Sequence, residues 1–233
     1  MVDIKQVVIL AGGKGTRMRE MTEDLPKPMV PIGNKPVLDH LINNFERFGN
    51  FEYIVCAGYL GNKIKEYYSE RKNVTVVDTG LNTNTGGRLY HVSKYLDENF
   101  IVTYGDGLAN IKINELINSY KQLGKIGIIT VTNPKSRFGL VEFDKNYLVE
   151  QFIEKPTLDG FINIGFMIFN KNFIKYLDIN SILESEPLEN LVRDKELSAF
   201  VHNGYFEPMD TYREYLQMNK LWNDGCPPWT NYE

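Results

Sequence analysis

Cysteine, histidine and an excess of basic charge are all scarce in this chain. Its 233 residues include two cysteines and three histidines, and 26 Lys and Arg against 30 Asp and Glu give a formal net charge of −4. Two widely separated cysteines, Cys56 and Cys226, do not form the disulfide framework that stabilises small secreted domains. We expect both to be reduced structural thiols in a cytoplasmic protein.

Two further absences exclude whole classes of function. The sequence has no run of Lys or Arg that would give the electrostatic footprint of a nucleic-acid-binding protein. It has no apolar stretch of membrane-spanning length, and its N-terminus lacks a signal-peptide pattern. We therefore expect neither a nucleic-acid partner nor a membrane. A phosphate ligand would have to be met by a few placed cations.

An apolar run that ends abruptly in glycines is the most informative feature present. The apolar part has the composition of a buried parallel strand. Glycines at the end of such a strand let backbone N–H groups approach an anion closely, and the cations that follow suit phosphate. The segment reads Val7, Val8, Ile9, Leu10, Ala11, Gly12, Gly13, Lys14, Gly15, Thr16 and Arg17, with Lys27 between two prolines further on.

The spacing of this segment excludes two common phosphate loops. A P-loop needs Gly-Lys-Ser/Thr after four intervening residues, and the dinucleotide fingerprint needs a third glycine where this chain has Met18. We interpret the segment as a nucleoside triphosphate loop of another type. A glycine-rich turn beside surface charge is the alternative.

The fold class follows from alternating elements in the first half. Strands are predicted over 6–11, 53–57, 74–77 and 100–104, and helices over 36–48, 62–68, 88–96 and 113–123. Such alternation indicates βαβ units and a parallel sheet, hence an α/β fold. Closely spaced strand candidates over 126–132, 139–144, 148–153 and 162–170 indicate added antiparallel pairing in the second half.

The rest of the chain yields three smaller expectations. Asn203-Gly204 favours a tight hairpin, residues 211–223 have the pattern of a helix, and Trp229 is expected to pack across the surface. No repeat or linker is evident. We therefore predict a single domain over 1–233, with a nucleotide-binding half over 1–125 and an acceptor-binding half over 126–233.

Two aspartates complete a set suited to phosphoryl chemistry. Asp106 lies between Gly105 and Gly107 at the predicted end of a strand, where parallel sheets bind ligands, and Asp210 precedes the last helix. Both carboxylates are candidate Mg²⁺ ligands, with Mn²⁺ as the other metal. A turn role for Asp106 and a helix N-cap role for Asp210 are the open alternatives. With Arg17 and Lys27 they would neutralise phosphate charge.

In order along almost the whole chain, the motifs resemble those of the sugar-1-phosphate nucleotidylyltransferases, in the cytidylyltransferase branch that includes glucose-1-phosphate cytidylyltransferase. Beyond the glycine segment, they are residues 74–80 (VTVVDTG), 85–89 (TGGRL), 103–107 (TYGDG), 137–139 (RFG), 154–156 (EKP), 186–188 (EPL), 208–211 (PMDT) and 227–229 (PPW).

The resemblance implies a Rossmann-like, mainly parallel mixed sheet flanked by helices, and a role for each matching position. The nucleotide would be held by Leu10, Ala11, Gly12, Gly13, Gly15, Thr16 and Arg17, with Thr85, Gly86 and Arg88 facing its base and ribose. The acceptor would be held by Lys27, Arg137, Gly139, Glu154, Lys155, Asn163 and Ile164. Asp106 and Asp210 would bind the metal, and Arg17 and Lys27 would be catalytic.

The implied reaction is an in-line attack by an acceptor phosphate oxygen on the α-phosphorus of CTP, with release of pyrophosphate. The attacking oxygen is already ionised at neutral pH, so no general base is required. This agrees with the positions of His40, His91 and His202, which stand outside every motif and are expected to be structural or on the surface.

The chain departs from its family in ways that bear on the acceptor. Only residues 69–73 precede the 74–80 motif, where the family has a longer segment, and Ile164 stands where the family has glycine. An isoleucine lining the pocket would not suit a hydroxyl-rich sugar. Its side chain could instead point into the core.

The short segment 69–73 and such an altered pocket would fit the related phosphoglutamine cytidylyltransferases, which serve capsular polysaccharide phosphoramidate biosynthesis. We therefore expect L-glutamine phosphate as the acceptor, ahead of glucose 1-phosphate. A non-catalytic nucleotide-binding regulatory module is the alternative of another class. The sequence leaves a homo-oligomer open.

Overall fold

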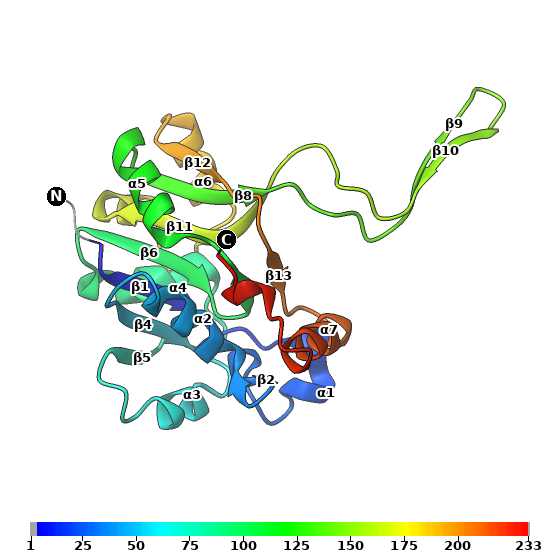
Figure 1. Cartoon of the computed structure of the whole chain (residues 1–233). Helices are drawn as coiled ribbons and strands as arrows, with labels where there is room; N and C mark the ends of the chain where they lie inside the picture. The colour runs from blue at the N-terminus through cyan, green and yellow to red at the C-terminus, as the bar shows by residue number, and fades with distance from the viewer. Residues whose placement is uncertain (1–3, 233) are drawn as a thin grey trace.

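A seven-stranded sheet organises the molecule, whose structure is a computed structural model that describes residues 4–232. The strand order is β12-β8-β11-β6-β1-β4-β5, and β11 alone runs antiparallel to its neighbours in this sheet (Figure 1). The strands are β1 Gln6–Leu10, β4 Glu52–Ala57, β5 Val74–Asp78, β6 Asn99–Tyr104, β8 Gly127–Thr132, β11 Ile162–Asn170 and β12 Leu197–Val201.

The central strands are buried on both faces, which explains their continuous apolar sequences. Successive side chains of a strand point to opposite faces. In β1, Val7 and Ile9 belong to one apolar core, whereas Val8 and Leu10 belong to another. The sheet therefore separates two cores, each covered by helices.

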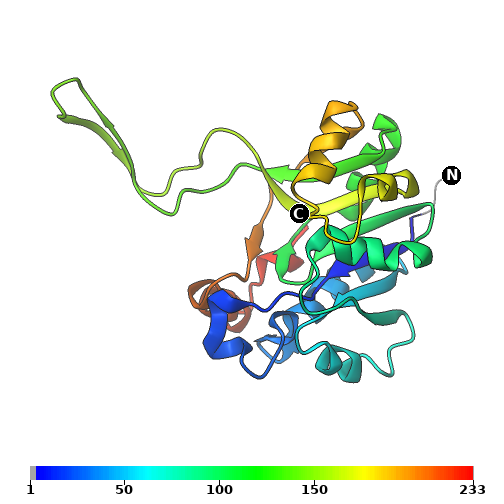
Figure 2. The ribbon, with the colours of Figure 1, turned by 180° about the vertical axis from the view of Figure 1, so that it is seen from behind.

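Helices cover the two faces of the sheet (Figures 1 and 2). One core contains side chains of α2 Val37–Glu46, α3 Gly61–Tyr67, α5 Ile113–Leu123 and α7 Tyr212–Asn223. The other contains side chains of α4 Thr85–Val92 and α6 Glu186–Arg193. None of the helices that the structure describes has the length and apolar character needed to cross a lipid bilayer.

Short elements complete the chain. They are the helical turns η1 Thr16–Met18, α1 Arg19–Thr22, η2 Lys27–Met29, η3 Ser93–Tyr95, η4 Lys171–Tyr176 and η5 Pro228–Thr230, and the strand pairs β2 Pro31–Ile32 with β3 Lys35–Pro36, β7 Gly107–Ala109 with β13 Phe206–Pro208, and β9 Leu140–Phe143 with β10 Val149–Ile153.

The predicted α/β class, with a mainly parallel sheet and added antiparallel strands, is confirmed. Two local predictions are wrong. Asn203-Gly204 does not form a hairpin, because the strands on either side of it pair elsewhere: β12 pairs with β8, and β13 pairs with β7. The chain crosses from one sheet to the other there, and Tyr205 N donates to Asn110 Oδ1. Trp229 is fully buried in the core, with its ring edge-on to His40, so it does not lie on the surface.

Residues 133–161 leave the body of the molecule as a long arm, whose outer part is the two-stranded ribbon β9–β10 (Figures 1 and 2). All nine residues of the two strands are exposed. The predicted strands at 139–144 and 148–153 therefore form, but they add nothing to the central sheet.

Candidate active site

The glycine segment ends at the edge of the sheet where several parallel strands finish together. Strand β1 is parallel to both β4 and β6, so their carboxyl ends share one edge. The loops after them are held together by backbone hydrogen bonds, from Gly105 N to Leu10 O and from Tyr59 N to Gly12 O. This edge places the residues after β1 beside Asp106.

The loop after β1 presents an open polar surface. Gly13, Lys14, Thr16 and Arg17 are exposed, and no atom would obstruct a Cβ at Gly13. Gly15 has a φ of 61°, in the left-handed region that glycine adopts without strain. Its carbonyl accepts a hydrogen bond from Thr22 Oγ1 at 3.1 Å. The loop is thus held at its base and open at its outer face.

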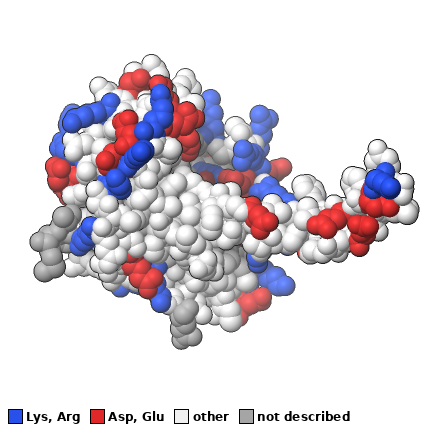
Figure 3. Space-filling model, turned by 90° about the horizontal axis from the view of Figure 1, so that it is seen from above, with Lys and Arg blue, Asp and Glu red and all other residues white. Residues whose placement is uncertain are grey.

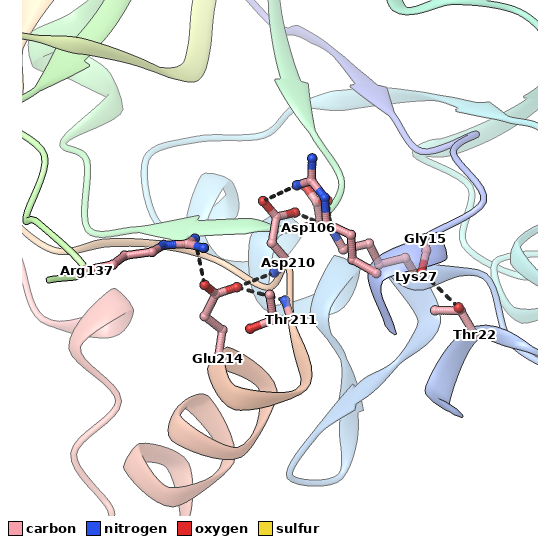
Figure 4. Close-up of polar contacts among 9 residues, drawn as sticks. Gly15, Thr22, Lys27, Asp106, Arg137, Asp210, Thr211 and Glu214 are labelled. Atoms are coloured by element: carbon pink, nitrogen blue, oxygen red, sulfur yellow. Dashed lines mark hydrogen bonds and ion pairs between the residues drawn. The ribbon is translucent and has the colours of Figure 1, made fainter. Parts of the chain in front are cut away.

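Two carboxylates and two cations meet beside this loop (Figure 4). Lys27 Nζ lies 2.5 Å from Asp106 Oδ2 and 2.7 Å from Asp210 Oδ1. Arg17 Nη1 lies 3.3 Å from the other oxygen of Asp210. Residues far apart in the sequence thus come together as the charge cluster Arg17, Lys27, Asp106 and Asp210, as the motif analysis predicted.

In this cluster, the attraction between opposite charges outweighs the effect of burial on the pKa values of Lys27 and Asp210. Although burial lowers the pKa of Lys27, the charges and hydrogen bonds of Asp106 and Asp210 raise it above its ordinary value. Burial in turn raises the pKa of Asp210, but the hydrogen bond and charge of Lys27 outweigh it and hold that pKa below its usual range. At neutral pH the ammonium and the carboxylate are therefore both charged.

Glu214, which the sequence analysis missed, positions Asp210. Its Oε2 accepts hydrogen bonds from the backbone N–H groups of Asp210 and Thr211, at 2.7 and 2.8 Å, and its Oε1 accepts one from Arg137 at 3.0 Å (Figure 4). Thr211 is the residue that precedes α7, so the N-cap alternative for Asp210 is wrong. The Thr-x-x-Glu spacing of a capping box was the available signal.

Arg88 has a different task from the predicted contact with a base. Its side chain is buried, and its guanidinium donates to the carbonyl oxygens of Gly12, Ala57 and Gly80 and to Thr79 Oγ1, at 2.7 to 3.1 Å. These acceptors lie at the carboxyl end of β4 and in the loops after β1 and β5. Arg88 therefore links the chain segments at the ends of β1, β4 and β5 through hydrogen bonds in the buried interior beneath the glycine loop.

Replacing Arg88 should destabilise the fold. Arg88→Met removes four hydrogen bonds and leaves buried carbonyl oxygens without their donor, so we expect the free energy of unfolding to fall by about 2–4 kcal/mol. Urea unfolding followed by circular dichroism measures this change. Arg193→Met, on the exposed side of α6, is the matched control and should stay close to the wild type. Equal midpoints for both variants would show that the buried guanidinium does not hold the loops.

The beginning of α4 is closed by the loop that precedes α6. Thr85 Oγ1 donates to Glu184 Oε2 at 2.6 Å, and Tyr104 OH donates to Glu184 Oε1. A Cβ at Gly86 would lie 2.8 Å from Ser181, so this glycine permits close packing and faces protein. Glu184 is thus an exposed carboxylate at the rim of the site that no sequence motif had marked as functional.

The predicted acceptor residues are only partly brought together. Arg137 and Lys155 line a cleft of about 580 Å³ at the root of the arm, beside Glu214. Gly139 and Glu154 directly flank β9 and β10, which stand out from the body (Figure 1). Asn163 is exposed, and its Oδ1 accepts from Gly165 N at 3.0 Å.

Ile164 does not line a pocket. Its side chain is 4% exposed and belongs to the apolar core that also contains Phe45 and Phe166. The expectation that Ile164 alters the acceptor pocket is therefore wrong, and the alternative of a core residue holds. The strand alternation that buries Ile164 turns Asn163 outward.

The carboxylates of the charge cluster fit a hard divalent cation. Asp106 and Asp210 both reach one nitrogen atom, so their oxygens already converge on a single point. Among residues 4–232 no group of three or more His, Cys, Asp and Glu side chains forms a metal site. A Mg²⁺ or Mn²⁺ ion held by these two side chains would complete its shell with water and phosphate oxygens, as Mg²⁺ commonly does.

Known proteins resemble this chain over nearly its whole length. The glucose-1-phosphate cytidylyltransferase of Salmonella typhi is 40% identical over 98% of this chain and 100% of that protein. The probable glucose-1-phosphate cytidylyltransferase of Bacillus subtilis (strain 168) is 38% identical over 96% of this chain and 98% of that protein.

Among solved structures, HddC from Yersinia pseudotuberculosis superposes with a TM-score of 0.73 at 28% identity, covering 94% of this chain and all of that one. The family model described as Nucleotidyl transferase matches residues 6–224. The resemblance found in the sequence motifs is thereby confirmed. This chain belongs to the nucleotidyl transferase family.

Proposed function

We propose that this protein is a cytidylyltransferase that transfers CMP from CTP to a sugar 1-phosphate, with glucose 1-phosphate as the acceptor. The observation that carries the proposal is Lys27, whose ammonium joins Asp106 and Asp210 beside the open glycine loop. A regulatory module would not need this charge cluster. Two relatives at 38 and 40% identity, matched over nearly their whole lengths, carry the name of this activity.

The cluster suits in-line phosphoryl transfer. An acceptor phosphate oxygen forms the new bond to the α-phosphorus of CTP, and the bond from that phosphorus to the β-phosphate oxygen breaks, releasing pyrophosphate. In the transition state, negative charge spreads over the oxygens of the transferred phosphoryl group and of the leaving pyrophosphate, and preorganised cations stabilise it. In this proposal Lys27 would contact the α-phosphate and the acceptor phosphate, and the exposed Arg17 would contact the departing phosphates. Their ion pairs with Asp106 and Asp210 beside the glycine loop support these roles.

A divalent cation is part of the proposal. Asp106 and Asp210 would hold it, and when bound it would neutralise phosphate charge. The chain itself orients one of these ligands, because Glu214 accepts hydrogen bonds from the backbone N–H groups of Asp210 and Thr211, on either side of the Asp210 Cα. Glu214, in the first turn of α7, thus fixes the backbone that carries the Asp210 carboxylate.

The choice of glucose 1-phosphate replaces our preference for L-glutamine phosphate in the sequence analysis. That preference depended on the short segment 69–73 and on Ile164 at the rim of the acceptor pocket. The side chain of Ile164 is in the core, so the second of these two grounds is lost. Lys155 and Arg137 remain at the root of the arm as candidate partners for the acceptor's phosphate.

The nucleotide preference is testable by rate. CTP should be used at least tenfold faster than UTP or dTTP, because each buried polar contact left unpaired by the wrong base loses about 1–3 kcal/mol. Pyrophosphate release with each nucleotide and glucose 1-phosphate gives kcat/KM. Equal values for CTP and UTP would overturn the cytidylyl assignment and leave the reaction type intact. No pyrophosphate release with any of the nucleotides would favour a regulatory module.

The acceptor is tested with CTP held saturating. We expect kcat/KM for glucose 1-phosphate to exceed that for L-glutamine phosphate by more than tenfold, which corresponds to about 1.4 kcal/mol in transition-state binding. The opposite ratio would restore L-glutamine phosphate as the acceptor. Asn163→Ala, which alters an exposed amide beside the buried Ile164, should raise KM for the preferred acceptor more than KM for CTP.

A further inference from the structure

Glu184 is a carboxylate that two hydroxyl groups hold at the rim of the site. It lies in the loop that precedes α6, and its side chain is exposed. Its Oε2 accepts a hydrogen bond from Thr85 Oγ1 at 2.6 Å, and its Oε1 accepts one from Tyr104 OH. Thr85 begins α4 and Tyr104 ends β6, so three separate elements meet at this carboxylate.

The two hydroxyl donors are themselves held in place. Thr85 Oγ1 accepts a hydrogen bond from Leu183 N at 2.9 Å, which leaves its proton for Glu184. The ring of Tyr104 packs against Gly165 so closely that a Cβ at that glycine would overlap it. Protein contacts therefore orient the Glu184 carboxylate before any ligand binds, which lowers the entropic cost of recognition.

No positive charge compensates this carboxylate. Within residues 4–232, no Lys or Arg nitrogen forms an ion pair with Glu184, whereas Asp106 and Asp210 are both paired with cations. Each carboxylate oxygen has two lone-pair positions, so each oxygen of Glu184 can accept one further hydrogen bond. Because a carboxylate repels phosphate, the matching ligand group is a hydrogen-bond donor without negative charge.

The position of Glu184 links it to the acceptor part of the site. Its partner Tyr104 is two residues before Asp106 in the chain. The glycine that contacts the Tyr104 ring, Gly165, is two residues after Asn163, an exposed residue of β11 that the motifs assign to the acceptor. Glu184 is therefore joined through one tyrosine to the strand ends that carry a candidate metal ligand and a candidate acceptor residue.

The carboxylate that the motifs assign to the acceptor stands elsewhere. Glu154 directly follows β10 on the arm, which projects from the body in Figures 1 and 3, and its Oε1 pairs with Lys155 Nζ at 3.2 Å. A sugar phosphate brings several hydroxyl donors that need acceptors when they leave water. The amide oxygen of Asn163 already accepts a hydrogen bond from Gly165 N. Glu184 is a carboxylate of the body with acceptor positions to spare.

We propose that Glu184 recognises the sugar of the acceptor by accepting hydrogen bonds from its hydroxyl groups, with Thr85 and Tyr104 as positioning residues. This inference rests on the proposed function, since it requires a sugar 1-phosphate as the acceptor. A site built to bind a hydroxyl group rejects an analogue that lacks it, because a polar group of the site is then left unpaired. Glu184 therefore selects a hydroxylated acceptor.

Kinetics with deoxygenated acceptors test the proposal on the full chain. With CTP saturating and Mg²⁺ present, pyrophosphate release is measured for glucose 1-phosphate and for each of its monodeoxy analogues. In the wild type, at least one analogue should lose about 10- to 100-fold in kcat/KM, as expected for a hydrogen bond to a charged group. In Glu184→Ala, glucose 1-phosphate itself should lose a similar factor. The same analogue should then differ from it by no more than about twofold, because the contact is already absent.

Further measurements separate recognition of the acceptor from a general defect. KM for CTP should stay within about twofold of the wild type in Glu184→Ala. Tyr104→Phe removes one donor to the carboxylate, so it should raise KM for glucose 1-phosphate and add nothing in the Glu184→Ala background. Glu189→Ala, which removes an exposed carboxylate of α6, is the matched control and should keep every wild-type ratio. Unchanged circular dichroism would show that each variant remains folded.

Three outcomes would overturn the proposal. Monodeoxy analogues that keep their full losses in Glu184→Ala would show that no acceptor hydroxyl contacts the carboxylate, while the proposed reaction stands. A change confined to the preference for CTP over 2′-deoxy-CTP would assign Glu184 to the ribose. A wild type that uses L-glutamine phosphate and not glucose 1-phosphate would overturn the proposed function together with this inference, and loss of that turnover in Glu184→Ala would assign the carboxylate to an ammonium group.

Discussion

Asp106→Asn should abolish turnover and leave the fold intact. An amide is a much weaker ligand for a hard cation than a carboxylate, and it removes one of the two charges that pair with Lys27. We expect kcat to fall by a factor on the order of 10³, about 4 kcal/mol in transition-state stabilisation. Pyrophosphate release with CTP, the acceptor and Mg²⁺ measures the loss.

Two controls separate the loss of turnover in Asp106→Asn from a general effect of replacing an aspartate. Asp224→Asn, an exposed aspartate that follows α7, makes the same chemical change away from the cluster and should retain wild-type rates. The Mg²⁺ concentration for half-maximal rate, measured on residual activity, should rise in Asp106→Asn only. Activity within a few-fold of the wild type would show that Asp106 is a turn residue, the alternative that its glycine neighbours left open.

Lys27→Met should produce a loss of similar size for a different reason. Without the Lys27 ammonium, the transition state loses a preorganised positive charge beside the reacting phosphates. Removal of one such hydrogen-bond donor lowers kcat by a factor on the order of 10²–10³. The pKa of Asp210 should also rise, because the hydrogen bond and charge of Lys27 are what hold it down against burial. The acid limb of the residual pH–rate profile should therefore move to higher pH.

The direction in which the acid limb of the pH–rate profile moves shows whether Lys27 lowers the pKa of Asp210. A depressed carboxyl pKa keeps Asp210 ionised as the pH falls, so losing Lys27 should make residual activity disappear at a higher pH than in the wild type. Lys121→Met, on the exposed side of α5, should leave both rate and profile unchanged. A Lys27→Met profile that coincides with the wild type would show that the ammonium does not control this carboxylate.

The glycine loop and the aspartate beside it could be predicted from the sequence because their signals are local. An apolar run followed by glycines determines a buried strand and an open loop, and parallel strands must end at a common edge. Asp106 follows a strand that pairs directly with β1, so its place beside the loop follows from topology. The joining of Lys27, Asp106 and Asp210 was predicted from the motifs, and the structure places them within hydrogen-bonding distance.

Only the tertiary structure decided the orientation of individual side chains. Arg88, inside a glycine-rich motif, points behind the loops because three carbonyl oxygens need a donor there. Trp229 is buried because the C-terminal segment folds back onto His40.

Ile164 and the arm are decided by packing over long distances in the sequence. Ile164 is a core residue because of the register of β11 against β8. The strands of the arm have the same alternating pattern as core strands, yet they stand away from the body. An alternating sequence pattern predicts that a strand has an apolar face, but it does not predict which segment or chain packs against that face.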